Sequence, residues 1–169
     1  FVSSMACDAI LDLPLLIREK ITVLHQCREE SIPSIEAKYA EKNVKAEIRS
    51  FFYDISMCLN KANLIISRSG ASSIAEFCFF GRPSILIPLP SAVYDHQTLN
   101  ATVMQDAGAS IVLDQNSLDS NFLTTKINYI LANFQVAHNM AISAKKLSRP
   151  DAASRFVAEL ENLSHKRAK

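Results

Sequence analysis

The residues of this chain best suited to bind an anion form one run of small side chains: Ser69, Gly70, Ala71, Ser72 and Ser73. The apolar residues 64–66 before them predict a buried parallel strand. Ile74, Phe77 and Cys78 after them have the spacing of one helix face. The first N–H groups of a helix lack intrahelical partners and lie at the positive end of its dipole. This strand, turn and helix therefore predict a phosphate or diphosphate site, with small side chains that let the anion reach the backbone.

The same residues allow a purely structural interpretation. Ser73 and Glu76 have the spacing of a capping box, in which the two side chains satisfy the start of their own helix. In the functional interpretation, the Glu76 carboxylate instead accepts hydrogen bonds from two adjacent ribose hydroxyls. The local sequence leaves both interpretations open.

The elements that must position this turn alternate along the chain. Strands are expected at 20–26, 45–52, 64–66, 83–88 and 110–113. Helices are expected at 3–18 with a break at Pro14, 31–42, 55–62, 72–80, 96–106, 119–134, 138–147 and 151–163. This order predicts a single α/β domain, with a Rossmann-like parallel sheet and helices on both faces.

Ligands of such folds bind beyond the carboxyl ends of the strands. Three polar loops are expected there, at 51–54, 67–73 and 89–97. Phe51 and Phe52 could form an apolar wall for a base, and Gln97 could reach the far end of a ligand. A diphosphate, a ribose, a base and a further polar end together describe a nucleotide-sugar.

Composition excludes several other classes. The 169 residues are 49% hydrophobic and 21% charged, with a net charge of +1, which gives no field for nucleic acid. No apolar run approaches the ~18 residues of a membrane span. The four cysteines are widely spaced and are expected to be reduced and mostly buried, without a metal site. His25 is expected to be a packed or hydrogen-bonded histidine, and Gly81 and Gly108 are expected to end helices.

A set of motifs resembles the N-acetylglucosaminyltransferases of bacterial peptidoglycan synthesis, in family 28 of the glycosyltransferases. The set comprises Arg68-Ser-Gly-Ala followed by Glu76, Gly81-Arg-Pro, Ile87-Pro, Asp95-His-Gln, and Asn100-Ala. His25-Gln26 and the 51–54 loop match in order and spacing. The resemblance covers almost the whole chain, but only the C-terminal half of those enzymes.

The resemblance implies the C-terminal half of a GT-B glycosyltransferase, an inverting enzyme that needs no cofactor or metal. It implies that this half binds UDP-N-acetylglucosamine, with Phe52 meeting uracil through its main chain. The residues implied to bind this donor are Phe51, Phe52, Ile55, Arg68, Ser69, Gly70, Ala71, Ser72, Ser73, Glu76, Gln97 and Thr98. The acceptor, lipid I, would be met by an N-terminal domain associated peripherally with the cytoplasmic face of the bacterial plasma membrane.

The chain also departs from the family. The family's first strand and Gly-rich loop precede the position of Phe1, so residues 1–169 are expected to be a donor domain from a longer polypeptide. Thr98 stands where some members carry a second Gln, and the loop before Asp95 is longer than in some relatives. No catalytic residue is expected here, so the chain alone should not transfer sugar.

Two alternatives remain open at this stage. The chain resembles the cytosolic subunit of the eukaryotic two-chain N-acetylglucosaminyltransferase, which binds UDP-N-acetylglucosamine and requires a membrane partner. A sugar-nucleotide epimerase would share the fold, but it needs acidic catalytic residues that cannot be placed in this sequence.

Overall fold

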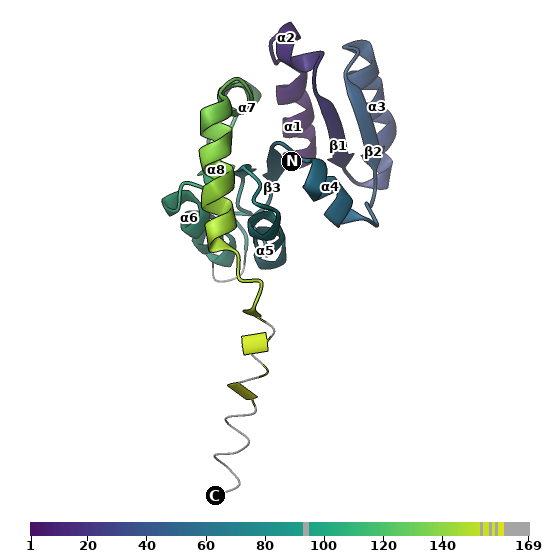
Figure 1. Ribbon diagram of the computed structural model, residues 1–169. Helices are drawn as coiled ribbons and strands as arrows, with labels where there is room; N and C mark the ends of the chain where they lie inside the picture. Colours follow the sequence, from purple (N-terminus) through teal and green to yellow (C-terminus); the bar gives the residue numbers. More distant parts are fainter. Residues whose placement is uncertain (93–94, 153, 156, 158, 161–169) are drawn as a thin grey trace, which may run out of the picture.

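The computed structural model describes residues 1–92, 95–152, 154, 155, 157, 159 and 160 (Figure 1). Its strands are β1 (Thr22–Gln26), β2 (Lys45–Arg49), β3 (Ile65–Ser67), β4 (Ser84–Leu86) and β5 (Ser110–Val112). Its helices are α1 (Val2–Leu11), α2 (Leu15–Arg18), α3 (Ile32–Glu41), α4 (Ile55–Lys61), α5 (Ala71–Phe80), α6 (His96–Asp106), α7 (Ser120–Leu131) and α8 (Phe134–Leu147), with a 3-10 turn η1 (Glu29–Ser31). The order of strands and helices confirms the predicted α/β class.

All described strand pairs are parallel, but they form two sheets and not the expected single one. β1 pairs with β2, with Thr22 opposite Lys45. The second sheet has the order β3-β4-β5. Since β1 and β3 each pair on one side only, each has one edge with no backbone ladder among the described residues. This also explains why Ile65 and Ile66 of β3 are only partly buried, although their sequence predicts a fully buried strand.

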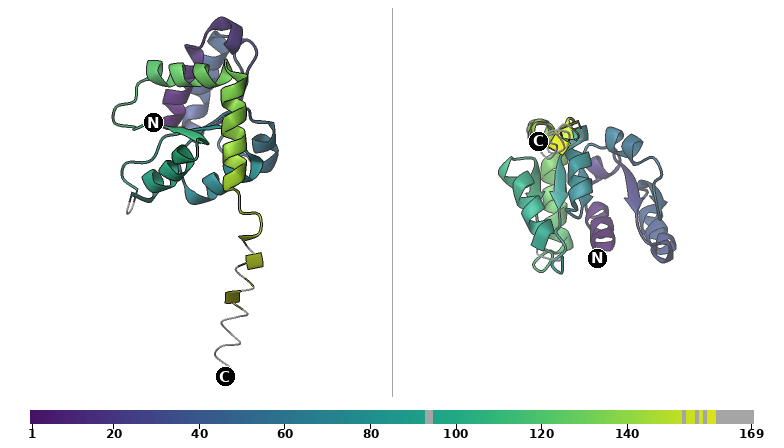
Figure 2. Two further views of the ribbon diagram at one scale, coloured as in Figure 1. Left: turned by 60° about the vertical axis from the view of Figure 1, so that its left-hand side comes forward. Right: turned by 90° about the horizontal axis from the view of Figure 1, so that it is seen from below.

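Helix α1 joins the two sheets into one structure. It packs against α3 on the β1–β2 side and against α7 on the other side, as Figures 1 and 2 show. Its buried residues Cys7, Ala9 and Ile10 belong to a core cluster that also contains Tyr39 of α3 and Leu123 of α7. The shared apolar core therefore holds the two sheets together where backbone hydrogen bonds do not.

Strand β4 is the central strand of the second sheet and separates two cores. Ile85 and Ile87 lie in the α1–α7 core, whereas Leu86 lies in a second core. That second core contains Phe77 of α5 and Met104 of α6. All three residues 85–87 have no exposed surface, as expected for a parallel strand with helices on both faces.

Most predicted elements are confirmed, with corrections at their ends. Pro14 separates α1 from α2, where the break was expected. Gly81 ends α5 with a left-handed φ of 61°, and Gly108 follows α6 with a φ of 71°. Helix α8 begins at Phe134 and not at 138, since α7 ends already at Leu131.

Of the predicted helix 151–163, residues 152, 154, 155, 157, 159 and 160 are helical, and residues 153, 156, 158 and 161–163 lie outside the described residues. Across the part of the chain that the structure describes, no helix is long and apolar enough to cross a membrane. The four cysteines are free thiols, and three of them, Cys7, Cys27 and Cys78, are buried.

Candidate functional site

The anion-binding turn predicted from the sequence connects β3 to α5. Helix α5 begins at Ala71, and its N-cap is Gly70, with no side-chain hydrogen bond capping this end among the described residues. Its first intrahelical bond runs from Ile74 N to Gly70 O, at 3.0 Å. The N–H groups of the first turn therefore lack an intrahelical partner.

The capping-box interpretation is wrong because the helix starts earlier than that motif requires. With Gly70 as the N-cap, Ser73 is the third helical residue, and its hydroxyl cannot act as the cap. Glu76 lies in the second turn and is exposed. The Glu76 carboxylate therefore does not cap the N-terminus of α5.

Gly70 is not required by the backbone conformation of the turn. Its φ is −63° and its ψ is 147°, which any residue can adopt. A Cβ added at this position would meet only Ser73 Oγ, at 3.8 Å. The glycine instead leaves open space beside the uncapped helix start, as close approach of an anion to the backbone requires.

Ser69 is fully buried, and its N–H, hydroxyl and carbonyl are all bonded to the first two turns of α6. Its hydroxyl donates to Gln97 O at 2.8 Å, and its N–H donates to Gln97 Oε1 at 3.4 Å. Asn100 Nδ2 donates to Ser69 O at 3.1 Å. Gln97 Oε1 also accepts from Leu89 N at 3.0 Å. One carboxamide oxygen thus connects the loops that follow β3 and β4.

The guanidinium of Arg68 is bonded to groups of the protein itself. Its Nη1 donates to the carbonyls of Ile87 and Pro88 at 3.0 and 2.9 Å. Its Nη2 donates to Gln115 Oε1 at 2.6 Å, and the guanidinium lies 6.0 Å from the Phe1 ring. Burial lowers the pKa of Arg68, and the three acceptors offset the cost of burying the cation. Arg68 therefore holds together the carboxyl ends of β3, β4 and β5.

The loop after β2 presents aromatic side chains at the same end of the strands. Phe51 is half-exposed, and its ring contacts that of Tyr53 edge-on at 5.2 Å. Phe52 is buried, with the Arg49 guanidinium 5.6 Å from its ring centre. Asp54 then caps α4 by accepting from Met57 N at 2.9 Å.

Helix α4 packs against α5, which connects this loop to the anion-binding turn. Ile55, the first residue of α4, is 38% exposed. Thr98 on α6 is exposed as well, and its carbonyl accepts from Thr102 Oγ1. Across the described residues, no hydrogen bond or ring contact joins Phe51, Ile55 or Thr98 directly to residues 69–73.

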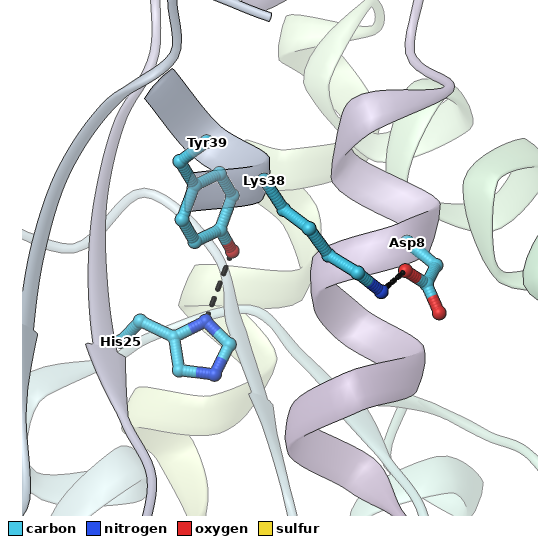
Figure 3. A network of polar contacts seen from close by, with 4 residues as sticks. All are labelled: Asp8, His25, Lys38 and Tyr39. Atoms are coloured by element: carbon cyan, nitrogen blue, oxygen red, sulfur yellow. Dashed lines mark hydrogen bonds and ion pairs between the residues drawn. The ribbon is translucent and has the colours of Figure 1, made fainter. Parts of the chain in front are cut away.

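His25 is a buried, hydrogen-bonded histidine at the end of β1, as its sequence predicted. Its Nδ1 lies 2.9 Å from the Tyr39 hydroxyl, drawn in Figure 3, and its Nε2 lies 2.7 Å from Ser3 Oγ. Burial lowers the pKa of His25. Beside it, Lys38 donates to Asp8 at 2.6 Å (Figure 3). These contacts attach α1 and α3 to β1.

Two side chains at this end of the sheet were not predicted as site residues. Asn100 follows Gln97 by three positions, so both lie on one face of α6. This spacing could have indicated that Asn100 lies beside Gln97 at the site. Gln115 follows β5, and nothing in its local sequence indicates its bond with Arg68. The described residues contain no group of three His, Cys, Asp or Glu side chains that could hold a metal ion.

Curated proteins of similar sequence match most of this chain. Among curated proteins, similar chains are named "UDP-N-acetylglucosamine–N-acetylmuramyl-(pentapeptide) pyrophosphoryl-undecaprenol N-acetylglucosamine transferase". The protein of Paramagnetospirillum magneticum is 36% identical over 152 residues, which are 90% of this chain and 41% of that protein. That of Wolbachia from Brugia malayi is 36% identical over 157 residues, which are 93% and 46%. The chain thus spans less than half the length of these relatives.

Solved structures agree with this fold. MurG of Acinetobacter baumannii matches with a TM-score of 0.77 and 27% identity, over 91% of this chain and 48% of that one. The glycosyltransferase VinC, solved with dTDP, matches with a TM-score of 0.66 at 15% identity, which supports the fold alone. These neighbours confirm the expected Rossmann-like fold of a GT-B glycosyltransferase half.

A family model, the glycosyltransferase family 28 C-terminal domain, matches residues 6–156. That range includes the uncapped turn before α5, the buried Ser69, and the aromatic loop after β2. The chain therefore belongs to the family of glycosyltransferase family 28 C-terminal domains.

Proposed function

We propose that this chain is the donor-binding domain of an N-acetylglucosaminyltransferase that moves N-acetylglucosamine from UDP-N-acetylglucosamine to lipid I, giving lipid II. The observation that carries the proposal is the uncapped start of α5, held in place beyond the carboxyl end of β3. Its free N–H groups and helix dipole suit the diphosphate of the donor. The names of the relatives favour this acceptor over that of the two-chain eukaryotic enzyme.

Each part of the donor has a matching part of the site in this proposal. The diphosphate lies on the N–H groups of residues 70–73. The exposed Glu76 accepts from the ribose hydroxyls, and the main chain at Phe52 contacts uracil, with Phe51 and Ile55 beside it. The sugar is met from α6 by Thr98 and by the Gln97 amide group, whose N–H groups remain available while its oxygen accepts from Leu89.

The site stabilises the leaving group in a specific way. When the bond from the sugar to the diphosphate breaks, negative charge grows on the diphosphate. Fixed N–H dipoles stabilise that charge without reorganising, so no metal ion is needed for this step. In this proposal, lipid I and the cytoplasmic face of the plasma membrane are contacted by the part of the longer enzyme that this chain does not cover.

Calorimetric titration of the chain with UDP, ADP and GDP tests the proposal. We expect UDP to bind most tightly, because backbone groups near Phe52 discriminate the pyrimidine edge. Glu76→Ala should weaken UDP binding by roughly tenfold or more, because a hydrogen bond to a charged acceptor contributes about 1.5–3 kcal/mol. Its melting temperature should stay unchanged, since Glu76 caps nothing.

Glu36→Ala provides the matched control. Glu36 is likewise an exposed helical glutamate, but it lies on α3, beside the other sheet. This variant should keep the wild-type affinity for UDP. Equal binding of the three nucleotides, or a Glu76→Ala chain that melts earlier yet binds UDP normally, would contradict the proposal.

A further inference from the structure

The position of the anion-binding turn is set by α6, a helix that the chain reaches only after one more strand. Among the described contacts of Ser69, all three polar interactions come from Gln97 and Asn100, and none comes from α5, the helix that the turn begins. Ser69 is completely buried, so water cannot replace these partners.

The two residues of α6 contact Ser69 in different ways. Gln97 contacts the N–H and the hydroxyl, and its Oε1 also accepts from Leu89 N. Asn100 contacts only the carbonyl oxygen. That carbonyl belongs to the peptide plane whose N–H is that of Gly70. Because the peptide unit is planar, a bond that fixes the Ser69 oxygen also fixes the direction of the Gly70 N–H.

We propose that Asn100 is a positioning residue for diphosphate binding, acting through the Ser69–Gly70 peptide plane. Its amide holds the Ser69 carbonyl toward α6, and in a trans peptide this keeps the Gly70 N–H on the opposite side, away from α6. Asn100 acts on the turn and does not contact the donor in this proposal. The inference rests on the proposed function, since it concerns how the same site binds a diphosphate.

The proposal predicts that Asn100 affects only ligands that carry the diphosphate. Without its amide, the peptide plane can rotate, and the Gly70 N–H loses its fixed direction. An N–H group that must be ordered when the ligand binds contributes less affinity than one that is already held in the binding direction. Removing one such hydrogen bond should weaken UDP by about tenfold, since a hydrogen bond contributes about 1 kcal/mol or somewhat more. Uridine, which lacks the diphosphate, should bind as before.

The experiment compares uridine, UDP and UDP-N-acetylglucosamine on the full chain and two variants. Asn100→Leu keeps the approximate size of the side chain and removes the amide, and Asn100→Ala also shortens it. Thr102→Val is the matched control, because Thr102 lies on the same helix and donates to the Thr98 carbonyl, away from the turn. Amide hydrogen exchange at residues 69–73 gives a second readout that needs no ligand.

In both Asn100 variants, the affinities for UDP and for UDP-N-acetylglucosamine should fall by about the same factor, and the affinity for uridine should stay the same. The amide hydrogens of residues 69–73 should exchange faster than in the wild type. The control should match the wild type throughout.

Loss confined to UDP-N-acetylglucosamine would overturn the proposal, because Asn100 would then contact the sugar directly. A parallel loss for all three ligands with a lower melting temperature would also overturn it, in favour of a general role in folding. A wild-type chain that binds none of the ligands would instead refute the proposed function itself, and hydrogen exchange would still report whether Asn100 orders the turn.

Discussion

At the scale of single residues, the site separates side chains that build the turn from side chains that face a ligand. Arg68 and Ser69 belong to the motif that suggests donor binding, yet both are bonded inward. Gln97 is shared, since its oxygen supports two loops. Gly70 and the first turn of α5 combine an open surface with N–H groups that lack an intrahelical partner. In the proposed site, the groups that would bind the diphosphate are therefore backbone groups, which buried side chains hold in place.

The two glycines at the ends of α5 give a prediction that separates binding from stability. Gly70→Ala should leave the melting temperature almost unchanged, since its φ is negative and a Cβ has room. It should weaken UDP binding at least several-fold, because the methyl group would lie where the anion approaches. Gly81→Ala should do the reverse. Its φ is +61°, and a Cβ would lie 3.3 Å from Ala141 O and from Lys145 Cβ.

Gly81→Ala should therefore destabilise the chain by about 1–2 kcal/mol and leave UDP affinity unchanged. Thermal unfolding and calorimetric titration of both variants check the pair. A Gly70→Ala chain with wild-type affinity for UDP would show that the diphosphate does not approach this backbone.

At the scale of elements, α1 depends on a buried histidine for its attachment to β1. His25 is 6% exposed and lies between Ser3 of α1 and Tyr39 of α3. Burial also raises the pKa of Tyr39, so its hydroxyl stays protonated and neutral at physiological pH. Since α1 connects the two sheets through the core, this junction concerns the stability of the whole chain.

The lowered pKa of His25 predicts acid sensitivity. The folded state disfavours the protonated ring, whereas the unfolded chain protonates it near the ordinary value of 6.5. The contribution of His25 to the free energy of unfolding is therefore fully present above pH 6.5. It decreases as the pH falls below 6.5, toward the pKa of His25 in the folded state. The decrease approaches about 1.4 kcal/mol per pH unit for one proton.

Urea denaturation at pH 7.5, 6.5 and 5.5 measures this effect. His25→Gln should flatten the pH dependence below pH 6.5, whatever its own stability at neutral pH. His138→Gln is the control, because His138 is exposed and stacks on Phe134. If the two variants show the same pH dependence, His25 is not the group responsible.

At the scale of the whole molecule, the outer strands of both sheets have an unpaired edge among the described residues. For β1 and β3, α1 and the shared core hold the two sheets together where no backbone ladder does. The longer relatives contain more than twice as many residues as the matched part. We propose that residues 1–169 act as one donor domain, with the acceptor and the catalytic base supplied from outside it.

This arrangement predicts that the chain binds donor without transferring it. Transfer needs an acceptor hydroxyl close to the anomeric carbon and a base within hydrogen-bond reach. His25 is buried in contacts with Ser3 and Tyr39, so it cannot be that base in this structure. An assay with radiolabelled UDP-N-acetylglucosamine and a lipid I analogue should give no product above background. Turnover by residues 1–169 would show that the base lies in this chain, and His96 would be the first residue to replace.

The sequence by itself determined the alternation of strands and helices, the position of the small-residue turn between β3 and α5, and the buried state of His25. These features depend on local patterns: apolar periodicity, small residues between a strand and a helix, and proline or glycine at element ends. Local patterns were weakest at boundaries. The start of α8 was predicted four residues too late, although Asn133, its N-cap, is a favoured N-cap residue.

Only the tertiary structure decided which polar groups of the motif are bonded inside the protein. The inward direction of Arg68, the bonds of Ser69 to α6, and the separation into two sheets all join residues far apart in the chain. The capping-box question was decided in the same way, by where α5 actually starts. Such pairings depend on how strands and helices pack in space. A side chain's type and its spacing to near neighbours do not specify its distant partner, so residue patterns predict a site's location better than the role of each residue in it.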